Sequence, residues 1–335
     1  MAGSHNAPGR QTSAPPTAGQ QTGAHMVREA KGGALVVAEA GPQALVQDHG
    51  RFGVRHLGVT QGGALDWVSL GWANWLLGNA PTAAGLEIAV GGLTLEAESR
   101  LTLALAGADL GARHDDTPIA PYTAFVIEPG QRLVFERPVH GLRAYLALPG
   151  GIAAAPVMGS LASVMREQLG GLDGQGRALA KGDRLIARHA ECQPRRLDTP
   201  PDPTAADLPL ALVTGAQIAH FDGASLFEAF NRTWQVDSRA DRMGVRLTGP
   251  VLRCRLGGMI SEGIPLGAVQ VPPDGQPIVL LNDRQTVGGY PRLGALSPLA
   301  CARLAQCQPG DSVRFAAVTP QRARRDYLAQ LARWQ

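Results

Sequence analysis

The chain has 335 residues, of which 44% are hydrophobic and 18% are charged, and its formal net charge is +3. This length leaves room for two domains of ordinary size. No apolar run reaches the roughly 18 residues that a membrane span needs, and the basic residues are scattered rather than gathered into a patch with aromatic residues. We therefore expect a globular cytoplasmic protein that binds neither a membrane nor nucleic acid.

The motifs of several common sites are absent from the sequence. It has no Gly-x-x-x-x-Gly-Lys-[Ser/Thr] phosphate loop, no Gly-x-Gly-x-x-Gly fingerprint, no His-Glu-x-x-His and no Gly-x-Ser-x-Gly elbow. The four cysteines form no Cys-x-x-Cys pair, and the histidines are scattered, so we expect free thiols and no metal site.

The first 30 residues are rich in Gly, Ala, Ser, Thr, Pro and Gln and lack periodic apolar positions, which predicts a disordered tail. The sequence Gly23-Ala24-His25-Met26 resembles a cloning junction, so the tail is either native or introduced by cloning.

A first β-rich domain is predicted over residues 31–193. Short apolar runs alternate with turn residues, and the 42 glycines and 25 prolines of the chain favour many turns over a helical bundle. One helix is predicted over 66–77, with Asp66 as its N-cap and Gly78 after its end; we interpret its tryptophans as core residues. The predicted strands are 35–40, 86–90, 93–97, 101–106, 124–127, 132–136 and 143–148.

A proline-rich linker is predicted over 194–208, followed by a second β domain over 209–335 with a C-terminal helix. A helix over 297–306 is indicated by Ser297 as N-cap and Pro298 at the first helical position. The last helix is predicted over 320–334, and the predicted strands are 208–213, 233–237, 244–248, 268–271, 278–281 and 312–316.

The two halves end alike, with Gly182-Asp183 and Gly310-Asp311 each leading into a strand. This similarity predicts a diverged duplication of one domain. The predicted fold class is therefore mainly β with a few helices, in two related domains.

The densest group of polar residues surrounds the predicted strand 278–281. Asp274 and Asp283 are candidate catalytic acid or base residues, and Arg284 is a candidate clamp for a substrate carboxylate. Candidate substrate-binding residues are the amides Gln270, Gln276 and Gln285, together with Thr286, Arg242 and Glu262. The alternative is that these residues only stabilise turns, since the pair Asp274-Gly275 favours a turn by itself.

A second polar group lies in the first domain, where Asp48, Arg51 and His56 alternate with glycines. Such a loop could bind an anionic or amide ligand. Equally, it could be structural, with Asp48 pairing with Arg51 and capping backbone groups.

Several motifs are shared with a known family: Gly41-Pro42-Gln43, Val46-Gln47-Asp48-His49-Gly50-Arg51, Gly63-Ala64-Leu65-Asp66, Arg242-Met243-Gly244, Ser261-Glu262-Gly263, Gln270-Val271-Pro272-Pro273-Asp274-Gly275-Gln276-Pro277 and Asp283-Arg284-Gln285-Thr286-Val287-Gly288-Gly289-Tyr290-Pro291. Through them the chain resembles, over residues 34–318, the biotin-dependent carboxyltransferase / allophanate hydrolase subunit 2 family. The resemblance implies two cyclophilin-like β-barrels, in agreement with the two strand-rich halves. The loop around His49 and Phe52 departs from many relatives, which leaves its ligand specificity open.

The resemblance implies one component of an ATP-dependent 5-oxoprolinase complex, which opens the lactam of 5-oxoproline to L-glutamate. The implied partners are an allophanate hydrolase subunit 1-like protein and a LamB/YcsF-like protein. We expect ATP to be bound with these partners, and no biotin to be attached to this chain. Transfer of phosphate to the lactam carbonyl oxygen would create a better leaving group, so that water could attack the carbonyl carbon.

Two other functions stay open within the same family. One is a carboxyltransferase or allophanate-related enzyme that acts on urea-type substrates, which the lack of a biotin-carrier segment in the sequence disfavours. The other is a regulatory binding protein like KipA, which needs no catalysis.

Overall fold

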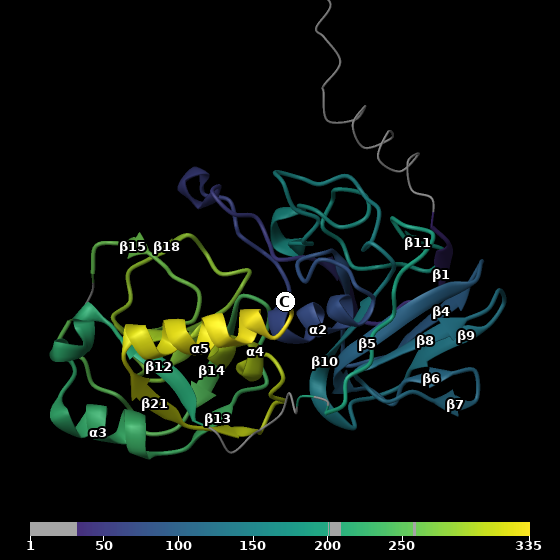
Figure 1. Ribbon diagram of the computed structural model, residues 1–335. Coiled ribbons are helices and arrows are strands. Elements are labelled where there is room, and N and C mark those ends of the chain that lie inside the picture. The colour runs from purple at the N-terminus through teal and green to yellow at the C-terminus, as the bar shows by residue number, and fades with distance from the viewer. Residues whose placement is uncertain (1–31, 200, 202–208, 257–258) are drawn as a thin grey trace, which may run out of the picture.

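The computed structural model describes residues 32–199, 201, 209–256 and 259–335, and the chain folds into two β-rich bodies that lie side by side (Figure 1). The predicted tail and most of the predicted linker lie outside the described residues. In the described part, no helix combines the length and the apolar character that crossing a membrane requires.

The first body contains two sheets that face each other across one apolar core. The six-stranded sheet has the order β11-β1-β4-β9-β6-β7, and the five-stranded sheet has the order β2-β3-β10-β5-β8. Their strands are β1 (Ala34–Glu39), β2 (Gln43–Gln47), β3 (Gly85–Ala89), β4 (Leu93–Ala97), β5 (Leu101–Asp109), β6 (Arg113–His114), β7 (Thr117–Pro118), β8 (Thr123–Ile127), β9 (Arg132–Phe135), β10 (His140–Ala147) and β11 (Arg184–Ile186).

Alternation along the strands explains how these sheets bury both of their faces. Leu103 and Leu105 of β5 point into the core between the sheets, whereas Ala104 and Ala106 point outward and pack under a helix. Successive strand residues face opposite sides, so β5 serves two cores at once. Each large aliphatic side chain buried in this way contributes about 1.5–3 kcal/mol.

The second body is built on one eight-stranded sheet of order β20-β13-β14-β17-β16-β19-β12-β21, and a short ribbon of β15 and β18 stands beside it. Trp234 is fully buried in its core. The strands are β12 (Leu210–Thr214), β13 (Trp234–Val236), β14 (Gly244–Thr248), β15 (Glu262–Gly263), β16 (Ala268–Gln270), β17 (Ile278–Leu280), β18 (Val287–Gly288), β19 (Arg292–Leu296), β20 (Ser312–Val313) and β21 (Phe315–Val318).

The two bodies repeat one turn in atomic detail, which supports the predicted duplication. In the first, the Gly182 amide donates to Val37, and the Val37 amide donates to Asp183. In the second, Gly310 and Asp311 make the same two bonds with Val236. The side chains of Asp183 and Asp311 both accept from the backbone amide three residues earlier, at 2.7 Å in each case.

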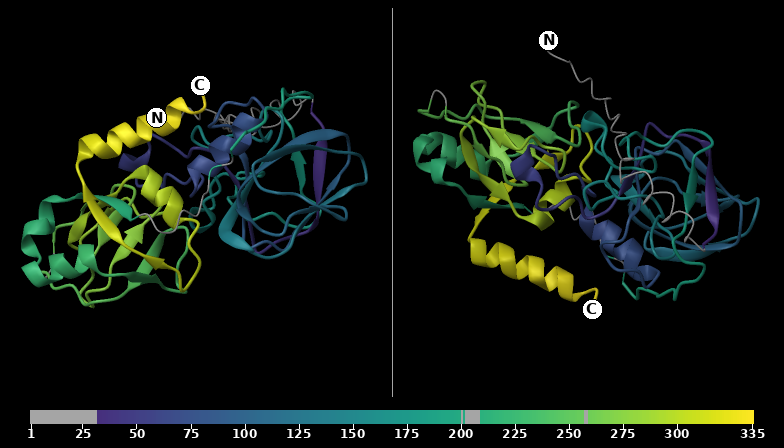
Figure 2. Two further views of the ribbon diagram at one scale, coloured as in Figure 1. Left: turned by 60° about the horizontal axis from the view of Figure 1, so that its bottom comes forward. Right: turned by 90° about the horizontal axis from the view of Figure 1, so that it is seen from above.

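The helices begin where their caps predict. Asp66 caps α2 (Trp67–Leu76) by accepting from Val68 and Ser69, and Ser297 caps α4 (Pro298–Leu304). The C-terminal α5 (Pro320–Ala332) lies outside the second body and points toward the first (Figure 2). Helix α3 (Gly223–Asn231) was not predicted from the sequence. Within the described residues, the other helices are the 3-10 turns η1 (Arg55–Leu57), η2 (Met165–Glu167) and η3 (Ala216–His220).

The start of the predicted linker is packed rather than free. Leu197, like Cys192 just before the linker, joins the apolar cluster around α2, and the Arg195 amide donates to the Leu76 carbonyl at the end of α2. The Arg195 guanidinium also lies 5.1 Å from the ring centre of Trp75. The described linker residues therefore belong to the surface of the first body.

Candidate functional site

A cavity of about 660 Å³ opens between the two bodies, and we treat it as the candidate site. Residues far apart in the sequence line it, and four of them are the aromatic residues Phe52, Trp67, Tyr327 and Trp334. The volume lies in the range that suits small-molecule sites, which often form between domains. The other lining residues are Asp48, His49, Gln61, Ala64, Leu70, Pro81, Thr82, Leu266, Asn282, Pro298, Leu331 and Gln335.

One wall of the cavity is a loop of the first body that is held by the second. The Asn282 side-chain amide donates to the carbonyls of Gly62 and Ala64, and the Gly62 amide donates back to the Asn282 carbonyl. Gly62 and Gly63 both have a positive φ, at 66° and 100°, which other residues adopt only with strain. The glycine pair therefore lets the loop turn tightly enough to meet Asn282.

The end of α5 forms the opposite wall. Trp334 packs edge-on against Trp67 with ring centres 5.7 Å apart, and Tyr327 lies 5.3 Å from Trp67. A Cβ atom on Gly71 would lie 2.3 Å from the Trp334 ring, so only glycine lets α5 approach α2 this closely. Helix α5 thereby carries aromatic residues of the second body to the first.

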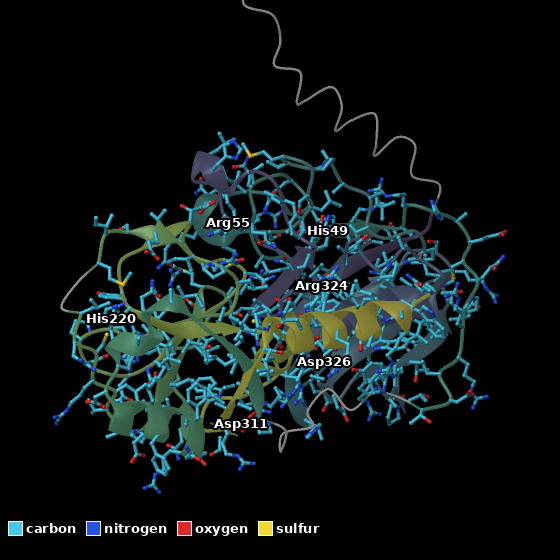
Figure 3. All side chains as sticks on the ribbon, turned by 60° about the vertical axis from the view of Figure 1, so that its left-hand side comes forward. His49, Arg55, His220, Asp311, Arg324 and Asp326 are labelled. Carbon is cyan, nitrogen blue, oxygen red and sulfur yellow. The ribbon has the colours of Figure 1, made fainter. Side chains whose placement is uncertain are left out.

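His49 and Phe52 stack at the cavity, with ring centres 5.4 Å apart, and both are exposed. In Figure 3, His49 and Arg55 both lie in the upper half of the view. His49 and Phe52 are two of the residues at which the sequence departs from the expected family pattern.

Beneath the cavity, a buried polar network joins the two bodies. Arg242 donates two bonds to Asp283, at 2.9 and 3.0 Å, and further bonds to Glu87 and to the Gly63 carbonyl. Glu87 also accepts from the Leu65 amide and the Tyr145 hydroxyl. All of these charges are buried, so they are tolerated only because they pair.

The electrostatics of the network favour ionised Glu87 and Arg242, whereas burial raises the pKa of the Asp283 carboxyl despite the charge of Arg242. Burial raises the pKa of the Glu87 carboxyl, but the charges of Arg242 and Arg143 outweigh it and hold that pKa below its ordinary value. Burial lowers the pKa of Arg242, but Asp283 and Glu87 outweigh it and raise that pKa above the ordinary value. Arg242 and Asp283, predicted as site residues, are therefore occupied with each other.

The Arg284 guanidinium is not free to bind a substrate carboxylate, as the prediction requires. It is 3% exposed, and it donates to the carbonyls of Ile264 and Leu281 and, at 3.4 Å, to the Gln61 side chain. Burial, followed by the nearby charge of Arg55, lowers its pKa to about 10. Through Gln61 it braces the cavity wall instead.

The predicted cluster around strand 278–281 separates in space, which corrects the expectation that its members form one site. Asp283 and Arg284 follow β17, whereas Asp274 and Gln276 precede it at the opposite end. The Asp274 carboxylate caps the Gln276 amide, and the Gln276 side chain bonds to both backbone groups of Gly249. These contacts agree with the alternative interpretation, in which Asp274 and Gln276 stabilise a turn.

The remaining predicted residues around the cluster are also separated from the cavity lining. Gln270 is buried in β16, and the Glu262 carboxylate pairs with Arg292 and accepts from Gln217. The backbone carbonyls of Gln285 and Thr286 accept from Arg55.

In the first loop, Asp48 reaches the cavity, but its side chain is occupied. It accepts from the Gly50 amide, the Ser160 hydroxyl and the Leu161 amide. Arg51 donates to carbonyls of the same 157–162 segment, so the two residues brace this segment. His56 is exposed on η1.

The residues that sequence reasoning missed lie on α2 and α5 and at Gln61 and Asn282. The Gly62-Gly63 pair signals a tight turn beside Gln61, but no local signal tells that α5 crosses to Trp67. Among the described residues, no group of three His, Cys, Asp or Glu side chains could hold a metal ion.

Comparison with known proteins identifies the family. The family model described as carboxyltransferase domain, subdomain A and B, matches residues 57–317. The chain is 39% identical over 305 residues to the C subunit of the 5-oxoprolinase of Escherichia coli strain K12, and this alignment covers 89% of this chain and 97% of that protein.

Solved structures agree with this result. The crystal structure of TTHA0988 matches with a TM-score of 0.76 and 36% identity over 85% of this chain, which spans 56% of that longer chain. The K. lactis urea amidolyase shares the fold, with a TM-score of 0.81 at 24% identity over 90% of this chain and 20% of that one. The chain therefore belongs to the family defined by the carboxyltransferase domain, subdomain A and B, as its resemblance to the biotin-dependent carboxyltransferase / allophanate hydrolase subunit 2 family predicts.

Proposed function

We propose that this chain is the C subunit of an ATP-dependent 5-oxoprolinase, which opens 5-oxoproline to L-glutamate together with two further kinds of subunit. The observation that carries the proposal is the 39% identity that extends over 97% of the E. coli protein. A likeness over nearly the whole length of both chains supports the same role in a complex. The proposed partners are a LamB/YcsF-like protein and an allophanate hydrolase subunit 1-like protein.

The cavity between the bodies is the proposed place for the lactam. Gln61 and Asn282 both line it: the Gln61 side-chain nitrogen can donate to a lactam carbonyl, and the Asn282 side-chain oxygen, whose NH2 group is held by Gly62 and Ala64, can accept from a lactam N–H. Aromatic side chains form much of the cavity wall, and a less polar environment strengthens such hydrogen bonds. His49 lines the cavity and is exposed, and we propose that its imidazole contacts the substrate there.

The cavity does not fit ATP well. A bound ATP would supply the phosphoryl group that activates the lactam carbonyl, but arginine and lysine, which hold polyphosphates, are missing from the lining residues. Asp48, the acidic lining residue, would repel a triphosphate. We therefore assign nucleotide binding to the partner proteins and no step of phosphoryl transfer to this chain.

The direct test is co-expression with the two candidate partner proteins, followed by an assay for glutamate release that depends on both ATP and 5-oxoproline. We expect release only with all three chains. No release in any combination, from a complex that assembles, would remove the proposal. The same complex supplied with urea and bicarbonate tests the urea-type alternative, and assembly without any turnover would favour a KipA-like regulator.

The role of the cavity is tested by Gln61→Ala. We expect kcat/KM to fall by roughly 5- to 100-fold, because one buried hydrogen bond to substrate is worth about 1–3 kcal/mol. The matched control is Gln235→Ala, at an exposed position on β13, which should leave kcat/KM unchanged. Equal kinetics for both variants would place the lactam elsewhere.

A further inference from the structure

Two amide side chains reach the cavity from neighbouring stretches of backbone. Gln61 directly precedes Gly62, which is bonded to Asn282 in both directions. Gln61 and Asn282 both line the cavity, and we call them the amide pair. A carboxamide donates through its nitrogen and accepts through its oxygen, so the direction in which each amide points decides which groups of a ligand it can bind.

The partners of the amide pair fix both directions. The Asn282 nitrogen donates to two backbone carbonyls, at 3.2 and 3.1 Å. Because a carbonyl oxygen only accepts, the nitrogen has to face these partners and the Asn282 oxygen is left for a ligand. The Gln61 oxygen accepts from Nη2 of Arg284 at 3.4 Å. Because a guanidinium only donates, here the oxygen is held and the Gln61 nitrogen is left for a ligand.

Arg284 is held in place by the backbone around it. It is buried, and it donates through Nε to the Ile264 carbonyl at 3.1 Å and through Nη1 to the Leu281 carbonyl at 3.2 Å. Burial and the charge of Arg55 lower its pKa only to about 10, so the guanidinium stays charged at neutral pH and does not become an acceptor. The contact with Gln61 therefore works in one direction.

The fixed directions place one donor and one acceptor close together at the cavity. A ligand that satisfies both has to present a carbonyl oxygen and an N–H group on the same edge. A five-membered lactam does so, because its ring closes the amide in the cis form. An open-chain secondary amide is almost always trans, with the two groups on opposite edges. A lactone keeps the carbonyl but has no N–H group to donate to Asn282.

We propose that Arg284 is a positioning residue that fixes the direction of the Gln61 amide, so that the amide pair selects ligands with a cis N–H and C=O on one edge. The inference rests on the proposed function, which places a lactam in this cavity. It goes beyond that function by giving Arg284 a role and by explaining how a lactam is distinguished from a lactone or an open-chain amide. Arg284 acts on the substrate through Gln61, rather than by binding a carboxylate.

The selectivity is tested with ligands that share a carboxylate and differ in the edge that faces the amide pair. They are 5-oxoproline, its N-methyl derivative, the corresponding lactone and the open-chain amide N-acetylglycine. The full chain is titrated alone and in the assembled complex, and tryptophan emission reports binding because Trp67 and Trp334 line the cavity. We expect 5-oxoproline to bind at least roughly ten-fold more tightly than the other ligands, because each of them leaves a member of the amide pair without a partner. Equal affinities for 5-oxoproline and the lactone would overturn the inference.

The role of Arg284 is tested with two substitutions of similar length, Arg284→Lys and Arg284→Met. Lysine only donates, so it should hold the Gln61 oxygen and keep the affinity for 5-oxoproline within about two-fold of the wild-type value. Methionine leaves the Gln61 amide free to turn, and the affinity should fall with the fraction of molecules that keep the correct direction, by roughly three- to ten-fold. Thermal unfolding shows that both variants are folded. Equal affinities for the two variants would remove the role of Arg284.

A double-mutant cycle separates positioning from general damage to the cavity. In a Gln61→Ala background, Arg284→Met should cause no further loss of affinity, because the amide that Arg284 directs is gone. A loss of the same size in both backgrounds would mean that Arg284 supports the cavity independently of Gln61, and it would overturn the inference. The matched control is Arg55→Met, since Arg55 donates to the same Ile264 carbonyl at 2.9 Å, whereas the Gln61 oxygen is bonded to Arg284. This control should keep the wild-type affinity, and a loss equal to that of Arg284→Met would count against positioning.

The outcomes separate this inference from the proposed function. If 5-oxoproline binds with the expected selectivity while the assembled complex releases no glutamate, the role of Arg284 stands and the proposed function fails. If the complex releases glutamate but Arg284→Met leaves both the affinity and KM unchanged, the proposed function stands and this inference is overturned. If 5-oxoproline binds neither the chain nor the complex, both are overturned.

Discussion

Arg242, which lies just before β14 in the second body, donates a hydrogen bond to Glu87 on β3 of the first. The two residues are 155 positions apart in the sequence, and both are buried. Because Arg242 also holds Asp283 through two bonds, one guanidinium fixes the second body's turn and the first body's sheet together.

Replacing Arg242 by alanine should destabilise the protein by about 3–5 kcal/mol, because two buried carboxylates lose the cation that they share. The measurement is urea unfolding followed by circular dichroism. Arg239→Ala is the control, since Arg239 pairs with Asp237 at the exposed surface and its loss should not shift the midpoint. A shift of the same size in both variants would contradict the structural role of Arg242.

Glu87→Gln should alter how stability depends on pH. The folded-state pKa of Glu87 is lowered, so its ionisation stabilises the protein above the unfolded-state value of about 4.3, and this contribution is lost as pH falls through the folded-state pKa. The difference in unfolding free energy between wild type and Glu87→Gln should therefore be largest near neutral pH and shrink below about pH 4. Unfolding curves at several pH values measure it, and a difference that stays constant with pH speaks against this linkage.

Gly71→Ala should displace the Trp334 ring from its packing against α2. The new Cβ atom would overlap the indole ring, and overpacking costs about 1–3 kcal/mol, which exceeds the gain of about 1 kcal/mol in helix propensity. We expect a red shift in tryptophan emission and reduced activity of the complex. Gly223→Ala is the control, because nothing lies within 4 Å of a Cβ atom there. An unchanged spectrum for Gly71→Ala would show that α5 does not depend on this contact.

Asp274→Ala separates the two interpretations of its turn. A catalytic acid or base contributes about 10²- to 10⁴-fold to the rate, whereas a turn residue at the exposed surface should change kcat less than two-fold and stability by less than about 1 kcal/mol. Because Asp274 only caps the Gln276 amide, we expect the second result. Steady-state kinetics of the reconstituted complex decide between them.

Much of the architecture could be predicted from the sequence because it depends on local patterns. The alternation in β5, the caps at Asp66 and Ser297 and the Gly-Asp turns at residues 182–183 and 310–311 all act within a few residues. The motif-based resemblance to the family was likewise confirmed. Helix α3 was missed although Asp222 caps it, because its nine residues are fewer than the roughly 11–18 over which a helical period stands out in a sequence.

The candidate site was decided by tertiary structure. Residues close in sequence, such as Asp274 and Asp283, end up at opposite ends of β17, because even a short extended strand carries the chain away at about 3.3 Å per residue. Residues far apart, such as Trp67 and Trp334, meet because α5 returns from the second body to the first. The sequence by itself determined the elements, their caps and the family. Only the packing of the two bodies decided which polar groups pair with each other at the interface between the bodies and which line the cavity. Burial and pairing depend on contacts between distant parts of the chain, and no local pattern encodes these contacts.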